Sequence, residues 1–356
     1  MRVLALALAG IGDALMFTPA ATILKRRRPD VRLDALCMFR GVKDIYDRTA
    51  LFDETTHFDF LKEGAFGSLK FLASLRGEYD ATINVYPTNR REYNLVARLI
   101  GAKTRVAARY LRQDAANLGF LNNLRVTESD DRHNATENVK LVEALFGFDA
   151  DEAPPYSFPL SEEDVAFAER FLEERGWRNE TLVGFHPGCS TLKNHEKRRW
   201  APERFSALAK RLIEERGAAV LVFGGPEERE LKGRVVAGVG SERCVAVESG
   251  NLAQSAALIK RCRAFATNDS SLMHVASATG TPTAAVIGPT NPNYIRPWRV
   301  PHRIVSLGLA CAPCFVYSPR PLTCAREDVK FKCVRELGVD LAYDAVVELL
   351  DGAEPR

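Results

Sequence analysis

A short apolar run, a turn that contains glycine or serine and then a helical segment recur along this chain of 356 residues. The first run, residues 3–9, leads through residues 10–13 into a helix predicted over 14–27. Strands that are apolar on both faces are typical of parallel sheets covered by helices. The recurrence therefore predicts an α/β protein built from right-handed strand–helix–strand units.

The pattern divides into two halves around residues 149–159, which contain three prolines and show no periodicity. In the first half, strands are predicted over 3–9, 31–38, 81–86 and 104–107, and helices over 14–27, 66–76, 90–100 and 135–146. In the second half, strands are predicted over 182–186, 219–223, 243–247, 264–266 and 283–287, and helices over 162–175, 202–216, 227–236, 252–261, 272–279 and 340–350. Residues 108–133 show no assignable pattern. Two doubly wound domains follow, with the active site expected between them, beyond the carboxyl ends of the strands.

The composition is that of a soluble globular protein, with 46% hydrophobic residues, 27% charged residues and a formal net charge of +3. This small excess of positive charge does not indicate a nucleic-acid partner, but it suits an anionic substrate or a membrane surface. No apolar stretch approaches the roughly 18 residues needed to span a bilayer. The N-terminal run is short and Asp13 follows it, which favours a first strand over a signal peptide. We therefore expect a cytoplasmic protein.

The segment 264–287 predicts an anion site. A strand end is followed by the polar turn 267–271 and by a helix of small residues that Gly280 ends. The free N–H groups and the positive end of the helix dipole would face a ligand framed by Asp269 and His274. The alternative is that Asp269 or Ser270 only caps the helix.

Three other strand ends carry residues with possible chemistry. After the first strand, Asp13 could act as a general base or could merely cap the following helix. The loop 184–191 could cradle a phosphate beside the basic residues that follow it, or those residues could be a solvated face. The carboxylates of the turn 224–228 could bind a ribose diol or complement a helix dipole.

The eight cysteines fall into two groups. Four are scattered, mostly among apolar residues, and are predicted to be reduced core residues: Cys37, Cys189, Cys244 and Cys262. The other four follow the spacing Cys311-x2-Cys314-x9-Cys324-x8-Cys333, in which only the first pair has a typical metal-site spacing. This spacing favours reduced or redox-sensitive thiols over structural zinc, so no metal site is predicted.

Taken in order, these loops resemble glycosyltransferase family 9, the ADP-heptose:lipopolysaccharide heptosyltransferases. The resemblance covers nearly the whole chain and rests on residues 10–13, 18–25, 28–30, 186–188, 197–205, 223–228, 268–276 and 288–290, with the Cys311/Cys314 pair. It implies a GT-B fold, with two doubly wound Rossmann-like domains facing a central cleft. The implied domains are an acceptor-binding domain over 1–155, a nucleotide-sugar-binding domain over 161–335, and a C-terminal helix over 340–356 that crosses back to the N-terminal domain.

The resemblance further implies an inverting, metal-independent transfer of a heptose or related sugar from ADP-heptose to a lipopolysaccharide core acceptor, without a cofactor. Asp13 would deprotonate the acceptor hydroxyl, and Lys197 or Arg198 would neutralise the diphosphate. The remaining donor-phosphate contacts would come from Gly188, Ser190, Ser270, Ser271 and His274. The donor sugar and nucleoside would contact Asp269, Glu228, Gly250 and Leu252. Acceptor candidates are Gly12, Arg40, Arg90, Arg91 and Arg109, although any one of these arginines could belong to a solvated face.

Two positions depart from the family pattern. Ser271 stands where the family usually has glycine. Ala201 is an extra residue before Pro202, which leaves Lys197 and Arg198 as alternatives for the diphosphate cation.

The expected partners are a nucleotide sugar and a lipid A-linked acceptor at the inner face of the inner membrane, and the expected oligomeric state is a monomer. The alternatives are another two-domain nucleotide-sugar enzyme, such as a UDP-sugar transferase or a 2-epimerase, and a non-catalytic nucleotide-sugar-binding protein. A dehydrogenase is disfavoured because no Gly-x-Gly-x-x-Gly follows either first strand.

Overall fold

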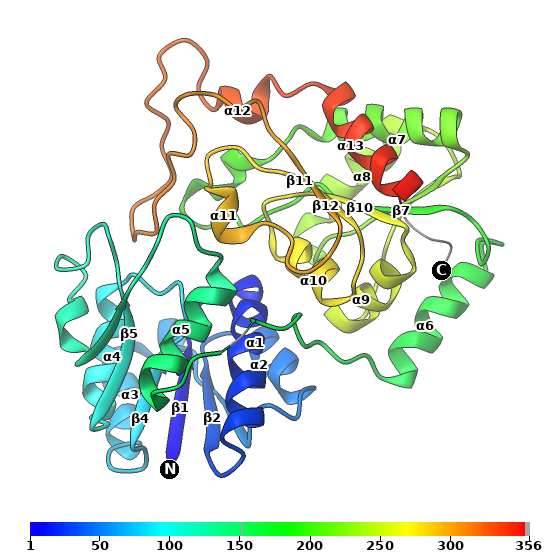
Figure 1. Cartoon of the computed structure of the whole chain (residues 1–356). Coiled ribbons are helices and arrows are strands. Elements are labelled where there is room, and N and C mark those ends of the chain that lie inside the picture. Colours follow the sequence, from blue (N-terminus) through cyan, green and yellow to red (C-terminus); the bar gives the residue numbers. More distant parts are fainter. Residues whose placement is uncertain (151, 353–356) are drawn as a thin grey trace. The chain divides into compact units, whose positions relative to one another are not determined.

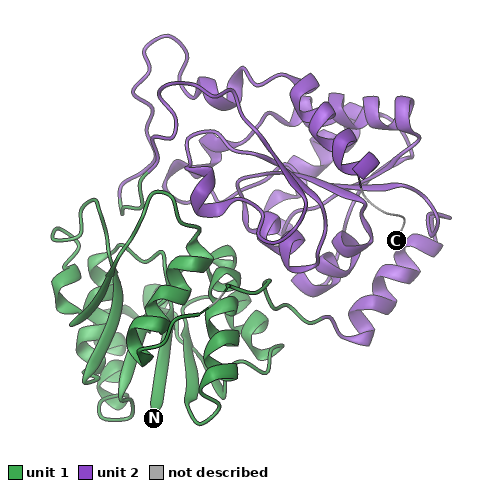
Figure 2. Cartoon of the chain, in the orientation of Figure 1, with its two compact units in different colours: residues 1–159, 316–319 green, residues 160–315, 320–356 purple. Residues whose placement is uncertain are grey.

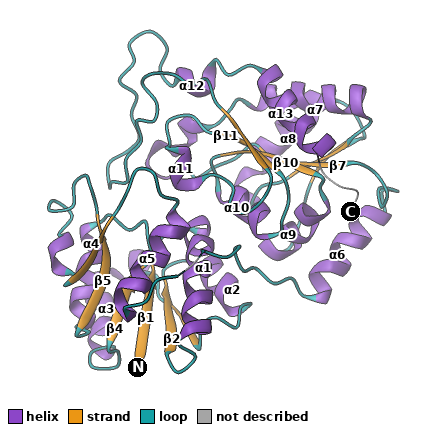
Figure 3. Cartoon of the chain, in the orientation of Figure 1, coloured by secondary structure: helices purple, strands orange, loops and turns teal. Residues whose placement is uncertain are grey.

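The computed structural model describes residues 1–150 and 152–352, which divide into two compact units (Figure 2). Unit 1 comprises Met1–Pro159 with Val316–Pro319, and unit 2 comprises Leu160–Phe315 with Arg320–Arg356. Each unit is built around one sheet of six parallel strands, with helices packed on the sheet (Figure 3). This architecture confirms the predicted fold class of two doubly wound α/β domains. The cleft between them stays a prediction.

Unit 1 holds a sheet in the order β3-β2-β1-β4-β5-β6. Its strands are β1 (Arg2–Ala7), β2 (Arg32–Cys37), β3 (Glu54–His57), β4 (Ala81–Asn84), β5 (Thr104–Arg109) and β6 (Leu124–Thr127). Its helices are α1 (Ile11–Arg27), α2 (Arg40–Asp47), α3 (Phe60–Ser74), α4 (Arg91–Ile100) and α5 (Asn134–Phe146), with the 3-10 turn η1 (Gly119–Leu121). Helix α1 packs against α5, and α3 packs against α4 (Figure 1).

Unit 2 holds a sheet in the order β12-β11-β10-β7-β8-β9. Its strands are β7 (Leu182–His186), β8 (Ala219–Val222), β9 (Cys244–Ala246), β10 (Ala264–Asn268), β11 (Thr283–Val286) and β12 (His302–Val305). Its helices are α6 (Glu162–Glu173), α7 (Pro202–Arg216), α8 (Arg229–Val239), α9 (Leu252–Arg261), α10 (Ser271–Ala278), α11 (Pro292–Ile295), α12 (Lys332–Arg335) and α13 (Val339–Gly352), with the 3-10 turns η2 (Leu192–Arg198) and η3 (Pro226–Glu228).

Both sheets have the same connectivity. Counted within each unit, the strands follow the order 3-2-1-4-5-6, in which the direction of winding reverses beside the first strand. In open parallel sheets, ligands bind beyond the carboxyl ends of the strands at this switch point. The switch point lies between β1 and β4 in unit 1, and between β7 and β10 in unit 2.

Helix α13 belongs to unit 2, and the crossing of segment 340–356 back to the N-terminal domain stays a prediction. It packs against α7 and against strands β10, β11 and β12. Val346, Leu349 and Leu350 are buried there, so the apolar face of the helix is already used by unit 2. Residues 353–356 of that predicted segment, and Asp151 of the predicted linker, lie outside the described residues.

The four residues Val316–Pro319 pack in unit 1 instead. The Tyr317 ring packs against Tyr86 at 5.9 Å and 82°. Asn134 donates a hydrogen bond to the Tyr317 hydroxyl at 2.8 Å, and Asn89 donates to its carbonyl at 3.1 Å. The chain therefore leaves unit 2, completes unit 1 and returns.

Several boundaries and elements differ from the predictions. Helix α3 begins six residues earlier than predicted, because the Asp59 carboxylate accepts hydrogen bonds from the backbone N–H groups of Leu61 and Lys62 and so caps it. Gly64, at φ 66°, then interrupts the helix. The unassigned segment 108–133 contains η1 and the edge strand β6. In the part of the chain that is described, no helix is long and apolar enough to cross a membrane.

Candidate functional site

The switch point of the unit 2 sheet brings together side chains from four loops, which follow β7, β8, β10 and β11. His186 is the last residue of β7, and it lies opposite Thr267 in the pairing of β7 with β10. Asp269 and Ser270 follow β10 and lead into α10, while Glu228 follows β8 in η3. The sheet order alone therefore places these side chains at one edge.

A buried hydrogen-bond chain links three of these loops. The His186 ring lies 2.8 Å from the Ser270 hydroxyl through Nδ1, and 2.9 Å from the Glu228 carboxylate through Nε2. Gly225 N–H donates to the same carboxylate at 3.2 Å. Ser270 stands at the N-cap position of α10, but its hydroxyl does not cap that helix. The capping alternative for Ser270 is thus wrong for its side chain.

The hydrogen-bond chain of Ser270, His186 and Glu228 requires a glycine at position 188. A Cβ atom on Gly188 would lie 1.7 Å from Glu228 Oε1, so any side chain there would displace the carboxylate. Burial raises the pKa of Glu228, but the hydrogen bond and charge of His186, the Gly225 N–H and Arg199 together outweigh burial and lower it. Glu228 is therefore held as a carboxylate.

A second buried cluster lies beside the first. Arg198 Nη1 donates to Asp269 at 2.5 Å and to the Thr290 hydroxyl at 3.2 Å. The Thr290 hydroxyl donates to the same Asp269 oxygen at 2.7 Å. Arg198 and Asp269 are each 8% exposed. The Phe315 ring lies over the guanidinium at 5.6 Å.

The local fold separates Arg198 from its neighbour Lys197. Lys193 and Asn194 adopt left-handed conformations, at φ 55° and 61°, and interrupt η2. Farther along η2, Arg198 is buried and Lys197 is exposed, with its ammonium 5.9 Å from the Phe331 ring. Of the two predicted cations, only Arg198 therefore joins the Asp269 cluster.

Asn268 fixes the loops around Arg198. Its side-chain oxygen accepts from the Trp200 N–H at 2.9 Å, and its amide donates to the Pro187 carbonyl at 2.7 Å. Both partners lie on segments that the sequence predicts to bind phosphate. Asn268 therefore holds the loop after β7 and the end of η2 against the start of α10.

Two histidines near the cluster are held neutral. Burial lowers the pKa of His274 to about 4, although the charge of Asp269 opposes the effect. Burial and the charge of Arg198 together lower the pKa of His195 to about 4. His195 Nδ1 lies 3.2 Å from Arg198 Nη2. At neutral pH the positive charges of the site are therefore those of Arg198 beside Asp269 and of Arg199, 3.7 Å from the Glu228 carboxylate.

Other predicted donor residues lie nearby or farther along the sheet edge. Ser271 is the first residue of α10, where backbone N–H groups of the first turn point out of the helix. Ser190 is exposed, and its hydroxyl accepts from the Leu192 N–H. Gly250 and Leu252 lie at the start of α9, after the edge strand β9, so they stand two strands away from β7.

The predicted residues of unit 1 also gather at strand ends. Asp13 is the third residue of α1, and its carboxylate accepts from the Gly10 N–H at 3.1 Å, so the predicted capping is present. Gly12 precedes it in the same turn. Four arginines follow or end strands of the same sheet, namely Arg40 after β2, Arg90 and Arg91 after β4, and Arg109 at the end of β5. The carboxyl edge of this sheet therefore carries these four arginines as well as Asp13.

Some of these arginines already have partners within unit 1. Arg90 lies over the Tyr93 ring at 5.6 Å, and Arg91 forms an exposed ion pair with Glu92 at 3.3 Å. An exposed pair of this kind contributes little to stability, so Arg91 can exchange its partner at small cost.

The scattered cysteines Cys37, Cys189, Cys244 and Cys262 are free and buried, as predicted. Cys311 and Cys314 are exposed, and Cys324 and Cys333 are partly exposed. Among the described residues, no three His, Cys, Asp or Glu side chains form a group that could hold a metal ion.

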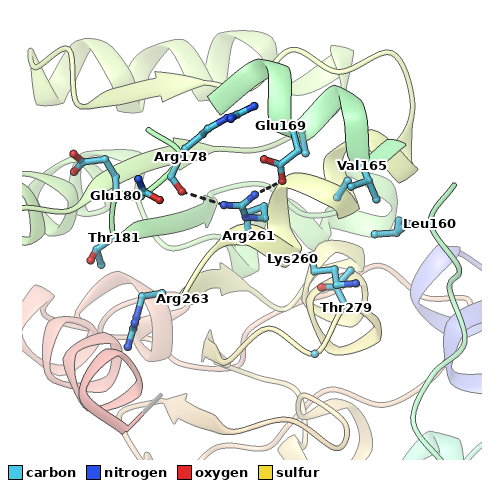
Figure 4. A pocket seen from close by; sticks show the side chains of 14 residues that line it. Leu160, Val165, Glu169, Arg178, Glu180, Thr181, Lys260, Arg261, Arg263 and Thr279 are labelled. Carbon is cyan, nitrogen blue, oxygen red and sulfur yellow. Dashed lines mark hydrogen bonds and ion pairs between the residues drawn. The ribbon is translucent and has the colours of Figure 1, made fainter. Parts of the chain in front are cut away.

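A cavity of about 730 Å³ lies at the opposite edge of the unit 2 sheet (Figure 4). Thr181, Arg263 and Gly280, which precede β7, β10 and β11, are among its lining residues. Within it, Arg261 is paired with Glu169 and donates to the Arg178 carbonyl at 3.1 Å. The cavity is therefore separate from the candidate site.

The roles of His186, Thr290 and Asn268 do not follow from the local sequence. All three lie at or just beyond the carboxyl end of a strand, which was the available signal. Their partners come from other strands, and the order of the strands decides which side chains meet.

Comparison with known proteins identifies the family. The profile of glycosyltransferase family 9 (heptosyltransferase) matches residues 68–323. The chain is 37% identical over 131 residues to the lipopolysaccharide heptosyltransferase 2 of Salmonella typhimurium, a match covering 35% of this chain and only 36% of that protein. It is 26% identical over 322 residues to the lipooligosaccharide heptosyltransferase 2 of Haemophilus ducreyi, covering 83% of this chain and 86% of that protein.

The structure of E. coli ADP-heptose lps heptosyltransferase II has a TM-score of 0.73 to this chain at 20% identity, covering 98% of each. That likeness shows a shared fold. Because the family profile spans well over half of the chain, the chain belongs to glycosyltransferase family 9.

Proposed function

We propose that this protein is an inverting, metal-independent glycosyltransferase that moves a heptose from ADP-heptose to a lipopolysaccharide core acceptor. The observation that carries the proposal is the buried Arg198 beside the N-terminal end of α10, at the switch point of the unit 2 sheet. A fixed cation and a helix N-terminus suit a leaving diphosphate, because both stabilise negative charge that develops in the transition state. The names of the relatives, two of them lipopolysaccharide or lipooligosaccharide heptosyltransferases, support the sugar and the acceptor class.

Arg198 is the better candidate for the diphosphate cation. It lies inside the cluster with Asp269 and Thr290, whereas Lys197 is exposed. A planar guanidinium can donate to two phosphate oxygens at once. Ser270, Ser271 and Gly188 would bring backbone N–H groups to the same phosphates, and Asp269 would accept from hydroxyls of the donor sugar.

Glu228 would hold the ribose of the nucleotide. Its carboxylate is kept charged by His186 and the Gly225 N–H, and each carboxylate oxygen can accept more than one hydrogen bond. Ser190, Gly250 and Leu252 would lie along the nucleoside, and His274 would stay neutral near the phosphates. The affinity for different nucleotides would therefore be set by contacts at this end of the site.

Asp13 would act as the general base. In the reaction the acceptor hydroxyl oxygen attacks the anomeric carbon, the bond from that carbon to the diphosphate oxygen breaks, and ADP leaves with the electron pair. The Asp13 carboxylate takes the hydroxyl proton. Attack opposite the leaving group inverts the anomeric configuration, and the arginines at positions 40, 90, 91 and 109, with Gly12, would bind the anionic acceptor.

The decisive experiment measures ADP release and product configuration with ADP-heptose and a core acceptor. Asp13→Asn is expected to lower turnover at least 1,000-fold, on the order of losing a general base and its charge, while ADP affinity stays within about twofold. Near-wild-type turnover of Asp13→Asn would refute the assignment of the base. UDP-sugars should give no turnover, and EDTA should leave the rate unchanged.

A matched pair of variants tests the diphosphate cation. Arg198→Gln is expected to weaken ADP binding by about 100-fold, because a charge-assisted bidentate contact contributes about 3 kcal/mol, whereas Lys197→Gln should change it less than about threefold. The two residues are neighbours with the same charge, so each variant is the other's control. A larger effect at Lys197 would overturn the choice of Arg198.

The remaining expectations belong to the same proposal. The enzyme would act as a monomer at the cytoplasmic face of the inner membrane, where the lipid A-linked acceptor is held.

A further inference from the structure

Unit 1 presents large apolar side chains to solvent on two neighbouring helices. Among the described residues, twelve large hydrophobic side chains are exposed, and five of these lie on α3 and α4. We call these five the apolar surface: Leu61, Phe66, Leu69, Leu95 and Leu99. Phe66 is 84% exposed and Leu61 is 77% exposed. Exposed apolar residues scattered singly are ordinary, but a concentration of this kind indicates a binding surface.

The side chains of the apolar surface are not part of the hydrophobic core of unit 1. The same two helices bury Leu72, Val96 and Ile100 in a cluster with β1, so their inward faces are already filled. Phe66 and Leu69, like Leu95 and Leu99, recur at helical spacing on the outward faces. Helices α3 and α4 pack against each other on the sheet, which brings the two outward stripes into one neighbourhood (Figure 1).

Basic residues outnumber acidic ones in the segment that carries the apolar surface. Residues 60–103 contain seven Lys or Arg and four Asp or Glu, a net charge of +3, which equals the formal net charge of the whole chain. The rest of the sequence is therefore electrically balanced. On the two helices, four basic residues, Lys62, Lys70, Arg91 and Arg98, are exposed beside the apolar side chains, against two exposed acidic residues, Glu63 and Glu92.

We propose that the outward faces of α3 and α4 dock the protein on an anionic lipid bilayer. Phe and Leu side chains enter the boundary between headgroups and acyl chains, while Lys and Arg contact the lipid phosphates. An apolar stripe interleaved with basic residues fits this partner better than a soluble protein, because a protein interface core is depleted of charge. Gly64 breaks α3 between Leu61 and Phe66, so each of its two short segments can follow the bilayer surface.

Docking through the apolar surface extends the proposed function, and it rests on that function only for the identity of the membrane, which would be the one that holds the acceptor. Helices α3 and α4 follow β3 and β4, so both begin at the carboxyl edge of the unit 1 sheet, where Asp13 also lies. Docking through these helices would bring that edge to a lipid-anchored acceptor. Binding to lipid is measurable without donor or acceptor, so a failure of docking and a failure of transfer are distinguishable.

The test is co-sedimentation of the full-length protein with vesicles of phosphatidylglycerol and phosphatidylethanolamine, and with vesicles of phosphatidylcholine as the neutral comparison. The wild type is expected to bind the anionic vesicles at least tenfold more strongly, with binding that weakens as salt rises. Leu61→Glu/Phe66→Glu should lower the partition coefficient at least tenfold. Leu341→Glu, an equivalent change of an exposed helical leucine in unit 2, should leave it unchanged.

A second measurement detects membrane contact as a gain of fluorescence signal and not as a loss of binding. Phe66→Trp is expected to gain a blue-shifted component of tryptophan emission when anionic vesicles are added, whereas Leu341→Trp should not. Turnover of Leu61→Glu/Phe66→Glu with a delipidated, soluble core oligosaccharide should equal that of the wild type. The proposal is overturned if the wild type does not bind anionic vesicles or if Leu341→Glu loses binding equally. It is also overturned if the wild type is a dimer that does not bind lipid and Leu61→Glu/Phe66→Glu converts that dimer to a monomer.

Discussion

Replacing Gly188 by alanine is the sharpest test of the buried chain around Glu228. The added Cβ would lie 1.7 Å from Glu228 Oε1 and 2.3 Å from its carboxyl carbon. Contacts of carbon and oxygen below 3.0 Å essentially never occur, so the carboxylate must move by more than about 1 Å. Its 2.9 Å hydrogen bond to His186 would then stretch beyond the distance at which such a bond counts.

The cost follows from the bond that is lost. A hydrogen bond to a charged group contributes about 1.5–3 kcal/mol, so Gly188→Ala should destabilise unit 2 by about 2 kcal/mol. For a domain of this size, that lowers Tm by about 4–8 °C. If Glu228 also holds the ribose, ADP affinity falls at least tenfold, since about 1.4 kcal/mol corresponds to a factor of ten.

Differential scanning calorimetry and ADP titration measure both effects. Gly233→Ala is the matched control, because Gly233 lies inside α8 with no atom within 4 Å of the added Cβ, and this change should stabilise by about 0.5–1 kcal/mol. In a Glu228→Ala background, Gly188→Ala should cost almost nothing further, because the bond is already gone. An equal cost in both backgrounds would show that the clash with Glu228 is not the cause.

Three further predictions test other parts of the fold. Because burial holds the pKa of His274 near 4, the unfolded chain takes up a proton below about pH 6.5 that the folded chain refuses, so stability should fall by about 3 kcal/mol between pH 6.5 and 4; urea unfolding of His274→Gln should lose this part of the pH dependence, and an unchanged slope would refute it. Gly184→Ala should destabilise by about 1–3 kcal/mol in chemical denaturation, because its Cβ would lie 2.5 Å from the Phe265 ring, and a neutral effect would contradict this packing. In the native protein, the exposed or partly exposed thiols of Cys311, Cys314, Cys324 and Cys333 should react with a thiol reagent before the four buried cysteines, which should react only after denaturation; equal rates for all eight, measured by peptide mapping, would contradict the burial.

The inner strands were predictable and several edge strands were not. Strands β1, β7 and β8 are apolar on both faces because helices cover them, and a continuous apolar run marks such a strand without any knowledge of its neighbours. The edge strands β3 and β12 read Glu-Thr-Thr-His and His-Arg-Ile-Val. An edge strand is partly exposed, so its residues need not be apolar and its sequence resembles that of a loop.

The candidate site was likewise predictable only in part. Its loops could be predicted, because each follows a predicted strand and the carboxyl edge of a parallel sheet is where ligands bind. Which side chains meet could not be predicted. His186 contacts Ser270 and Glu228 only because β7 lies between β10 and β8, an order that local sequence does not encode. The choice between Arg198 and Lys197 likewise depends on the folded path of η2, which buries Arg198 and leaves Lys197 exposed.

The short segment Val316–Pro319 has a consequence for dissecting the molecule. Unit 1 is not a continuous piece of sequence, because Tyr317 completes it beside Tyr86, Asn89 and Asn134. A fragment cut at Pro159 would leave a vacant space against the Tyr86 ring and two amides without these partners. Chimeras that exchange the N-terminal half between relatives therefore require two crossover regions, one near residue 159 and another that transfers residues 316–319 with it.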